Sequence, residues 1–197
     1  MDVLKTIREI RICDIDMDAA FRYAKELEEK YGVTVKVAGS VEEAVRGSDV
    51  INVATSGSVS PRIEDEWLGE GSLLTLPASA DISESLMKSS RIVVDNWEMY
   101  EAYAEELSNV PGGFAKNLSG ICGFMMDLVW SGKIRKEDIT GLGDVAAGKA
   151  EGRLNDREKV IFIMDGMPIE DLAWGHTIYR NALEKGIGTK LNLWGEP

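Results

Sequence analysis

Residues 40–54, SVEEAVRGSDVINVA, decide the fold class of this chain. Ser40, with Glu43 three residues later, has the spacing of a capping box, which predicts that a helix begins there. Val50–Ala54 follows as an apolar run of the kind that lies inside a parallel sheet. A helix that leads at once into a buried strand is half of a βαβ unit, so this stretch predicts an α/β protein.

The same alternation continues on both sides of this stretch. Upstream, Arg8–Asp14 and Val33–Val37 are predicted strands, and a predicted helix from Asp18 to about Lys30 lies between them, with apolar residues at spacings of three and four. Asp18 is the expected N-cap of that helix, and Gly32 is the expected stop. Downstream, the predicted strands are Ser72–Leu76, Arg91–Asp95 and Lys159–Met164, and the predicted helices are Ile63–Leu68, Ile82–Lys88, Trp97–Leu107, Leu118–Trp130, Ile139–Ala147 and Pro168–Lys185.

This spacing predicts an open, doubly wound parallel sheet of the Rossmann type with helices on both faces. We expect one α/β domain over residues 1–165, followed by a C-terminal helix and an extended tail over residues 166–197. A G-x-G-x-x-G loop should precede the strand that ends at Asp14, and the chain has none. We therefore expect a dinucleotide-binding domain that lacks its first strand and its glycine loop.

Composition excludes several classes of function. The chain has 197 residues with 22 Lys and Arg against 34 Asp and Glu, so its net charge is −12. That balance disfavours nucleic acid and anionic membrane surfaces as partners. No apolar run reaches the roughly 18–20 residues of a membrane helix, and the N-terminus has no signal-peptide pattern. Cys13 and Cys122 are predicted to be buried thiols in a reducing compartment, which favours the cytoplasm.

Ligands of a doubly wound sheet bind at the carboxyl ends of its strands, so the residues just after each strand are the candidate site. Asp14 is placed to bind ribose hydroxyls, although a loop or capping acid would look the same. Thr55 and Ser56 could leave room for a cofactor or form a plain loop. Ser79 and Asp81 could face a nicotinamide ring or a substrate, but Asp81 could equally cap a helix that begins near Ile82.

Other chemistry has little support in the sequence. The single histidine, His176, lies within a predicted helix and excludes a two-histidine metal site, so we expect no metal. No G-x-S-x-G, P-loop or Cys-x-x-Cys motif occurs.

Three segments resemble the ornithine cyclodeaminase/μ-crystallin family. They are residues 40–55 (SVEEAVRGSDVINVAT), residues 91–98 (RIVVDNWE) and, most specifically, residues 143–174 (GDVAAGKAEGRLNDREKVIFIMDGMPIEDLAW). The tail, residues 182–197 (ALEKGIGTKLNLWGEP), together with residues 93–98, is most similar to a branch that oxidises an N-substituted amino acid during 2,3-diaminopropionate synthesis. The resemblance implies a Rossmann domain that holds NAD(P).

The resemblance also implies roles for single residues. Asp14 matches the ribose-binding acid, and the absence of an arginine directly after it favours NAD over NADP. Thr55 and Ser56 match the loop beside the cofactor. Ser79 falls where ornithine cyclodeaminases have a catalytic aspartate, with Asp81 two residues further on, and Met164 stands where many members have a serine near the nicotinamide.

Family members are considerably longer, and their N-terminal half supplies the substrate-binding arginines, a lysine and the glycine loop. The chain is therefore expected to be a fragment that is inactive alone. In full-length form it is expected to be a homodimer whose helix and tail, residues 166–197, pack on the substrate and dimerisation domain. The implied reaction is NAD-dependent oxidation of a small amino acid or an N-substituted amino acid through an imine. The alternative is a non-enzymatic protein that binds a nucleotide or a small effector.

Overall fold

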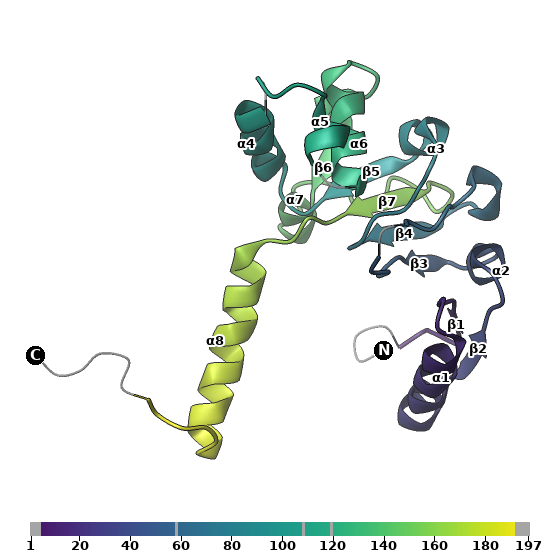
Figure 1. Ribbon diagram of the computed structural model, residues 1–197, viewed down its shortest axis with the longest axis vertical. Coiled ribbons are helices and arrows are strands. Elements are labelled where there is room, and N and C mark those ends of the chain that lie inside the picture. The colour runs from purple at the N-terminus through teal and green to yellow at the C-terminus, as the bar shows by residue number, and fades with distance from the viewer. Residues whose placement is uncertain (1–4, 58, 108, 119, 192–197) are drawn as a thin grey trace, which may run out of the picture. The chain divides into compact units, whose positions relative to one another are not determined.

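The computed structural model describes residues 5–57, 59–107, 109–118 and 120–191. The chain divides into two compact units, residues 1–165 and residues 166–197. The first unit alternates strands and helices (Figure 1). Its strands are β1 Glu9–Ile12, β2 Thr34–Val37, β3 Val50–Asn52, β4 Leu73–Leu76, β5 Arg91–Val94, β6 Ile139–Gly141 and β7 Val160–Ile163. Its α-helices are α1 Met17–Tyr31, α2 Val41–Val45, α3 Glu84–Ser89, α4 Trp97–Leu107, α5 Phe114–Asn117, α6 Gly120–Trp130 and α7 Leu142–Ala146.

The larger sheet of the described residues has five strands in the order β3-β4-β7-β5-β6, and every pairing is parallel. The last strand in sequence, β7, lies in the middle, so Ile161 is in register with Leu74 on one side and Ile92 on the other. Leu74, Ile161 and Ile163 are fully buried, as the interior strands of a parallel sheet require. This arrangement confirms the predicted α/β class and parallel pairing.

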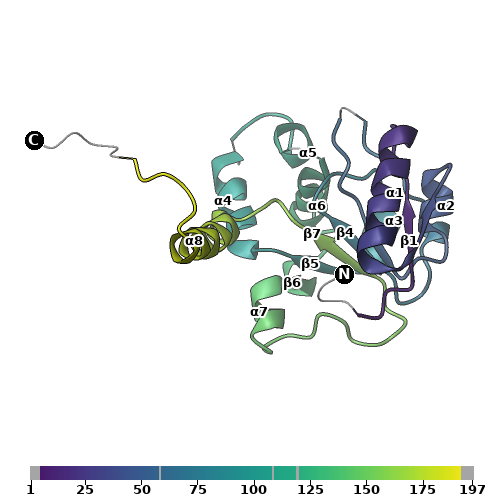
Figure 2. The ribbon, with the colours of Figure 1, turned by 90° about the horizontal axis from the view of Figure 1, so that it is seen from below.

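Helix packing covers the larger sheet. The apolar helix α6 buries Met125 and Met126 completely, and α5 packs closely against it, as Figures 1 and 2 both show. The buried phenol of Tyr100 brings α4 into the same core. These helices follow β5 along the chain, and buried residues of β5, α4 and α6 belong to one core.

A smaller sheet is formed by β1 and β2, which pair in parallel and carry α1 against them. Gly32 ends α1 with φ 65°, and its N–H donates to the carbonyl of Glu28, so the predicted stop is confirmed. The N-cap is Asp16, whose side chain accepts the N–H of Ala19, and the prediction of Asp18 was therefore wrong by two residues.

The capping box before α2 is present in a modified form. Ser40 Oγ accepts the N–H of Glu43 at 3.1 Å, and Glu43 Oε2 accepts the N–H of Gly39 at 2.8 Å. Both free donors at the start of the helix are thereby satisfied, as the motif predicts, with the second bond one residue further out than usual.

Three predicted elements differ from the structure. Ile139–Gly141 is the strand β6, paired with β5, so only Leu142–Ala146 of the predicted helix 139–147 is helical. The predicted helix 63–68 is a single 3₁₀ turn, Asp65–Trp67. The strand predicted to lie inside a sheet, β3, is at an edge of the larger sheet among the described residues.

The second unit is described by α8, Pro168–Lys185. Pro168 occupies its first turn, and Gly186 ends it with φ 62°, as the sequence predicts. Most of the predicted extended tail, from residue 192, lies outside the described residues. Among the helices of the described part of the chain, none is both long and apolar enough to cross a bilayer.

Candidate functional site

The carboxyl ends of β4, β7 and β5 adjoin in the larger sheet, and polar groups gather there. Asp95 directly follows β5, Asp165 follows β7 by two residues, and Ser79 lies three residues after β4. Because adjacent parallel strands end at the same edge, the three side chains come from one end of the sheet.

Asp95 joins these strand ends. Its carboxylate is buried, with 4% of the residue exposed. Oδ1 accepts the N–H of Asn96 at 2.9 Å and the phenol O–H of Tyr100 at 3.1 Å, while Oδ2 accepts the N–H of Asp165 at 2.9 Å. The carboxylate therefore fixes the ends of β5 and β7 to each other and to α4.

A buried thiol extends this network. Cys122 Sγ, on α6, lies 3.8 Å from Asp165 Oδ1 and 3.9 Å from the oxygen of Tyr100. Burial raises the pKa of the Cys122 thiol to about 12, and the charge of Asp165 adds to this effect. Burial likewise raises the pKa of Tyr100 far above its ordinary value, with Cys122 and Asp95 contributing. Both groups therefore stay protonated at neutral pH, and Cys122 acts as a weak donor instead of a nucleophile.

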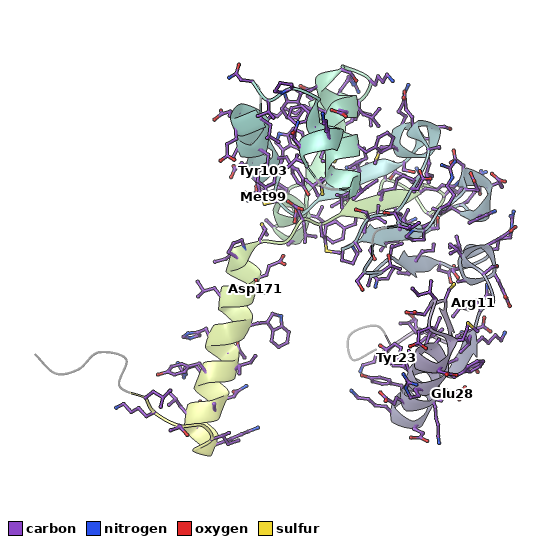
Figure 3. The ribbon with its side chains drawn as sticks, in the orientation of Figure 1. Arg11, Tyr23, Glu28, Met99, Tyr103 and Asp171 are labelled. Carbon is purple, nitrogen blue, oxygen red and sulfur yellow. The ribbon has the colours of Figure 1, made fainter. Side chains whose placement is uncertain are left out.

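Tyr103 of α4, which is labelled in Figure 3, borders the same network, since its ring meets that of Tyr100 edge-on with 6.3 Å between the ring centroids. Burial raises the pKa of Tyr103, and a hydrogen bond with Asp165 raises it further. Tyr103 therefore remains a neutral phenol that donates toward the carboxylate at the end of β7. An acid, a phenol and a thiol thus converge on this strand end.

Ser79 is held against the beginning of α6. Its Oγ accepts the N–H of Ile121 at 3.4 Å. Gly120 has φ 61°, and a Cβ built there would overlap Ser79 Oγ, so this close approach requires glycine. The predicted site residue is therefore placed beside α6, a contact that the sequence does not indicate.

Met164 extends the ladder of β7 by one hydrogen bond. Its N–H donates to the carbonyl of Leu76 at 3.3 Å, and its side chain is half-buried. Since Ser79 follows Leu76 by three residues, the structure brings Ser79 and Met164 to the same edge of the sheet.

Thr55 and Ser56 are exposed after β3, the next strand along that edge. Val53, just before them, accepts the N–H of Ala78 at 3.1 Å, which joins the loops after β3 and β4. These residues therefore share the edge with Ser79, as the sequence predicts.

Asp14 lies in the smaller sheet, after β1, and its exposed carboxylate accepts the N–H of Asp16 at 2.8 Å. The described residues do not bring it into contact with Ser79 or Met164. The free part of its carboxylate faces solvent, where it can accept hydrogen bonds from a ligand.

Asp81 does not cap a helix. Its exposed carboxylate pairs with Arg62 at 3.0 Å, and its backbone forms a bridge with the same residue. Ser83 is the N-cap of α3, where its Oγ accepts the N–H of Leu86 at 2.9 Å. The capping interpretation was therefore wrong, and the carboxylate is instead committed to an ion pair.

The sequence profile of the ornithine cyclodeaminase/mu-crystallin family matches residues 1–186. The chain belongs to this family.

Two curated relatives illustrate the range of activities in the family. The alanine dehydrogenase of Archaeoglobus fulgidus is 28% identical over 194 residues, which cover 95% of this chain and 53% of that protein. The N-((2S)-2-amino-2-carboxyethyl)-L-glutamate dehydrogenase of Staphylococcus aureus is 29% identical over 157 residues, which cover 79% of this chain and 41% of that protein. The chain spans about half the length of the curated relatives it matches.

Solved structures agree with the family assignment. The Δ1-pyrroline-2-carboxylate reductase of Thermococcus litoralis, in complex with NADH and L-proline, matches with a TM-score of 0.71 and 25% identity, covering 94% of this chain and 53% of that one. An archaeal alanine dehydrogenase dimer with bound NAD matches with a TM-score of 0.68 and 27% identity, covering 95% of this chain and 53% of that one.

Within this family member, sequence reasoning missed Asp95, Tyr100, Cys122 and Asp165. A signal for two of them was available, because Asp95 ends the predicted strand Arg91–Asp95 and Asp165 directly follows the predicted strand Lys159–Met164. The rule that singled out Asp14 applies equally to them. Tyr100 and Cys122 gave no such signal, since each lies within a helix and joins the network only through packing.

The described residues are compatible with the ribose and the nicotinamide of a dinucleotide, but not with its pyrophosphate. Asp14 offers a solvent-facing acceptor for ribose hydroxyls, and the edge formed by Thr55, Ser79 and Met164 is lined by small or flexible side chains. The first turn of α1 is unsuited to a pyrophosphate, because Asp16 caps it and Asp18 adds a second negative charge. Among the described residues, the carboxyl ends of the strands thus present an exposed carboxylate and small or flexible side chains, while the first turn of α1 carries acidic groups that disfavour a phosphate.

Proposed function

We propose that this chain forms the cofactor-binding half of an NAD-dependent enzyme that oxidises a small amino acid, or an N-substituted amino acid, through an imine. The observation that carries the proposal is the group of polar residues at the carboxyl edge of the larger sheet, in a chain of this family. Bound NAD⁺ would accept a hydride from the substrate's α-carbon, while the amine nitrogen loses a proton and an imine remains.

The chain's own residues would bind the cofactor and orient the reacting groups. We assign Asp14 to the adenosine ribose, and Thr55 and Ser56 to the loop beside the cofactor. Ser79 and Met164 would border the nicotinamide. Ser79 is a poor general base without a neighbouring base to activate it, so its proposed role is to orient the reacting groups.

In this proposal, Asp165 is the residue that accepts the proton from the substrate amine. Its carboxylate lies at the strand end, and Asp95 fixes its backbone through a 2.9 Å hydrogen bond. Asp81 was the other candidate, but its carboxylate is paired with Arg62. Asp165 is therefore the acid that we expect to accept the amine proton, with Tyr103 as its hydrogen-bonding neighbour.

The relatives support this class of chemistry without fixing the substrate. The Archaeoglobus protein is named for alanine, the Staphylococcus protein for an N-substituted glutamate, and the Thermococcus structure holds NADH with L-proline. The resemblance of the C-terminal tail leads us to propose an N-substituted amino acid. We also propose that the complete protein assembles as a homodimer, as the archaeal alanine dehydrogenase does.

Titration of the chain with NAD⁺, followed by NMR amide shifts, tests the cofactor assignment. With a ribose acceptor but no phosphate cradle, we expect a Kd on the order of 1 mM, which corresponds to about −4 kcal/mol. The shifts should concentrate at Asp14, Thr55 and Ser56, and Asp14→Ala should abolish them while Asp81→Ala leaves them unchanged. Shifts that spare Asp14, or that persist in Asp14→Ala, would refute the assignment.

A further inference from the structure

A hollow of about 530 Å³ lies at the edge of the larger sheet opposite the candidate site. Its lining comes from the end of α3, the first residues of β5, the segment between α6 and β6, and the segment before β7. These segments meet where β5, β6 and β7 begin, because adjacent parallel strands start at the same edge (Figure 1). Asp95 and Asp165 follow the other ends of β5 and β7, so the hollow is separate from the candidate site.

Arg91, the first residue of β5, is the half-buried cation of the hollow. Its Nη2 donates to Thr140 Oγ1 at 3.1 Å, while its Nε is buried without an acceptor. Among the described residues, its guanidinium forms no ion pair with a carboxylate. A charge removed from water needs a counter-charge or a full set of hydrogen bonds. Arg91 therefore retains the capacity to bind a carboxylate from solution.

Two further groups of the hollow have unused hydrogen-bonding capacity. The hydroxyl of Ser90 is buried without a partner in the described part of the chain. Glu158 is half-buried and lies close to Arg91, because the register of β5 and β7 places Arg91 opposite Val160. Its Oε2 accepts the N–H of Leu154 at 2.7 Å, and its Oε1 accepts no hydrogen bond from the residues that the structure describes. The inner wall of the hollow thus presents a cation, a hydroxyl and a carboxylate.

The rim of the hollow is positive beside α3. Lys88 and Lys133 both line it, and their ammonium groups lie 3.7 Å and 2.7 Å from the carboxylate of Glu84. Because two ammonium groups share one carboxylate, a positive charge remains at this part of the rim.

The acids of the hollow disfavour a simple anion as its ligand. Arg135 pairs with Asp138 through two hydrogen bonds of 2.6 and 2.8 Å, and Glu137 is exposed beside them. With Glu84 included, the four basic side chains of the hollow face four acidic ones in the described part of the chain. A phosphate would bring negative charge against Glu158, and a metal cation would be repelled by the guanidinium. A molecule that carries both a cation and an anion complements the hollow better than either.

We propose that this hollow binds a free α-amino acid with an acidic side chain. Its α-carboxylate would accept hydrogen bonds from Arg91 and Ser90, and its ammonium group would donate to Glu158. The side-chain carboxylate would lie toward Lys88 and Lys133. No covalent bond forms or breaks, so this is a second ligand site and not a catalytic one. The inference does not rest on the proposed function, because it uses none of the residues assigned to the cofactor or the substrate.

Titration of the chain with L-glutamate, followed by NMR amide shifts, tests the inference. We expect a Kd on the order of 1 mM, since an open hollow gives a small ligand few contacts. The shifts should concentrate at Arg91, Thr140 and Glu158, while Thr55 and Ser56 should keep their shifts. Glutarate has both carboxylates of glutamate but no ammonium group, so it should bind at least about tenfold more weakly.

Three variants locate the ligand within the chain. Arg91→Gln removes the positive charge but keeps a donor for Thr140. Glu158→Gln likewise keeps an acceptor for the N–H of Leu154. Each should weaken the binding of L-glutamate at least about tenfold, because a hydrogen bond to a charged group is lost or becomes neutral. Arg62→Gln, in an exposed ion pair outside the hollow, should bind as the wild type does. Circular dichroism checks that the variants fold, and if one of the first two does not, the other decides.

Four results would overturn the inference. They are the absence of binding, equal binding of glutamate and glutarate, equal binding by the wild type and Glu158→Gln, and shifts confined to Ser79 and Asp165. The last result would mean that glutamate occupies the candidate site, which favours the proposed function. Failure of the chain to bind NAD⁺, in contrast, would count against the proposed function and leave this inference intact.

Discussion

Replacing Asp95 with asparagine should destabilise the chain, because it removes a buried carboxylate. Among the described residues, the N–H of Asn96, the O–H of Tyr100 and the N–H of Asp165 each donate a hydrogen bond to Asp95, at 2.9 to 3.1 Å. Asparagine keeps one acceptor oxygen and replaces the other with an NH₂ group. That NH₂ faces a donor, so at least one buried N–H or O–H loses its partner.

The size of the effect follows from these bonds. Leaving a buried donor unpaired costs about 1–3 kcal/mol, and bonds to a charged acceptor are stronger than bonds to a neutral one. We therefore expect Asp95→Asn to lower the free energy of unfolding by about 2–4 kcal/mol. For a chain of this size each kcal/mol lowers Tm by about 2–4 °C, so Tm should fall by roughly 4–16 °C.

Urea unfolding followed by tryptophan fluorescence and circular dichroism measures this change. Tyr100→Phe removes only one of the three bonds and should cost about 1 kcal/mol. Asp81→Asn, at the exposed pair with Arg62, should unfold with the wild-type midpoint, because exposed ion pairs add little stability. If Asp95→Asn unfolds at the wild-type midpoint, or costs less than Tyr100→Phe, the proposed role of Asp95 in joining β5 to β7 is wrong.

Further predictions concern the cofactor, the thiols and the branch of the family. In a protein completed with the missing half, Asp14→Ala should raise the KM for NAD about 10- to 150-fold, because a good hydrogen bond to a charged group contributes about 1.5–3 kcal/mol; an unchanged KM would refute the ribose assignment. In the Cys13→Ser variant the buried Cys122 is the remaining thiol. At pH 8 the folded variant should not react with a thiol reagent until it unfolds, because burial raises the pKa of Cys122. Rapid labelling of the folded variant would contradict the raised pKa. The raised pKa of Cys122 also predicts a pH dependence, because the thiol ionises near pH 9 in the unfolded chain and near pH 12 in the folded one. The free energy of unfolding should therefore decrease as the pH rises from about 9 to about 12, and it should decrease less steeply in Cys122→Ala. The completed protein should form little proline from ornithine and should reduce NAD⁺ with an amino acid or N-substituted amino acid instead; rapid proline formation without accumulation of NADH would defeat this prediction.

Local sequence determined the elements and most of their ends. The strand Val33–Val37, the helix Trp97–Leu107 and the helix Pro168–Lys185 follow from patterns that repeat within a few residues. Gly32 and Gly186 stop their helices because a left-handed residue is needed there, a requirement that a single glycine meets wherever it occurs. The family resemblance likewise rests on contiguous segments, and the profile match over residues 1–186 confirms it.

Tertiary structure alone decided where those elements sit and which side chains meet. The order of strands places β7 between β4 and β5, and no local pattern encodes a neighbour that lies distant in sequence. Asp95 and Asp165 are 70 residues apart and meet only because their strands are adjacent, while Tyr100 and Cys122 join them through helix packing. Ile139–Gly141 resembles a helix locally but pairs with β5, since the hydrogen bonds offered by a sheet edge outweigh a weak local propensity.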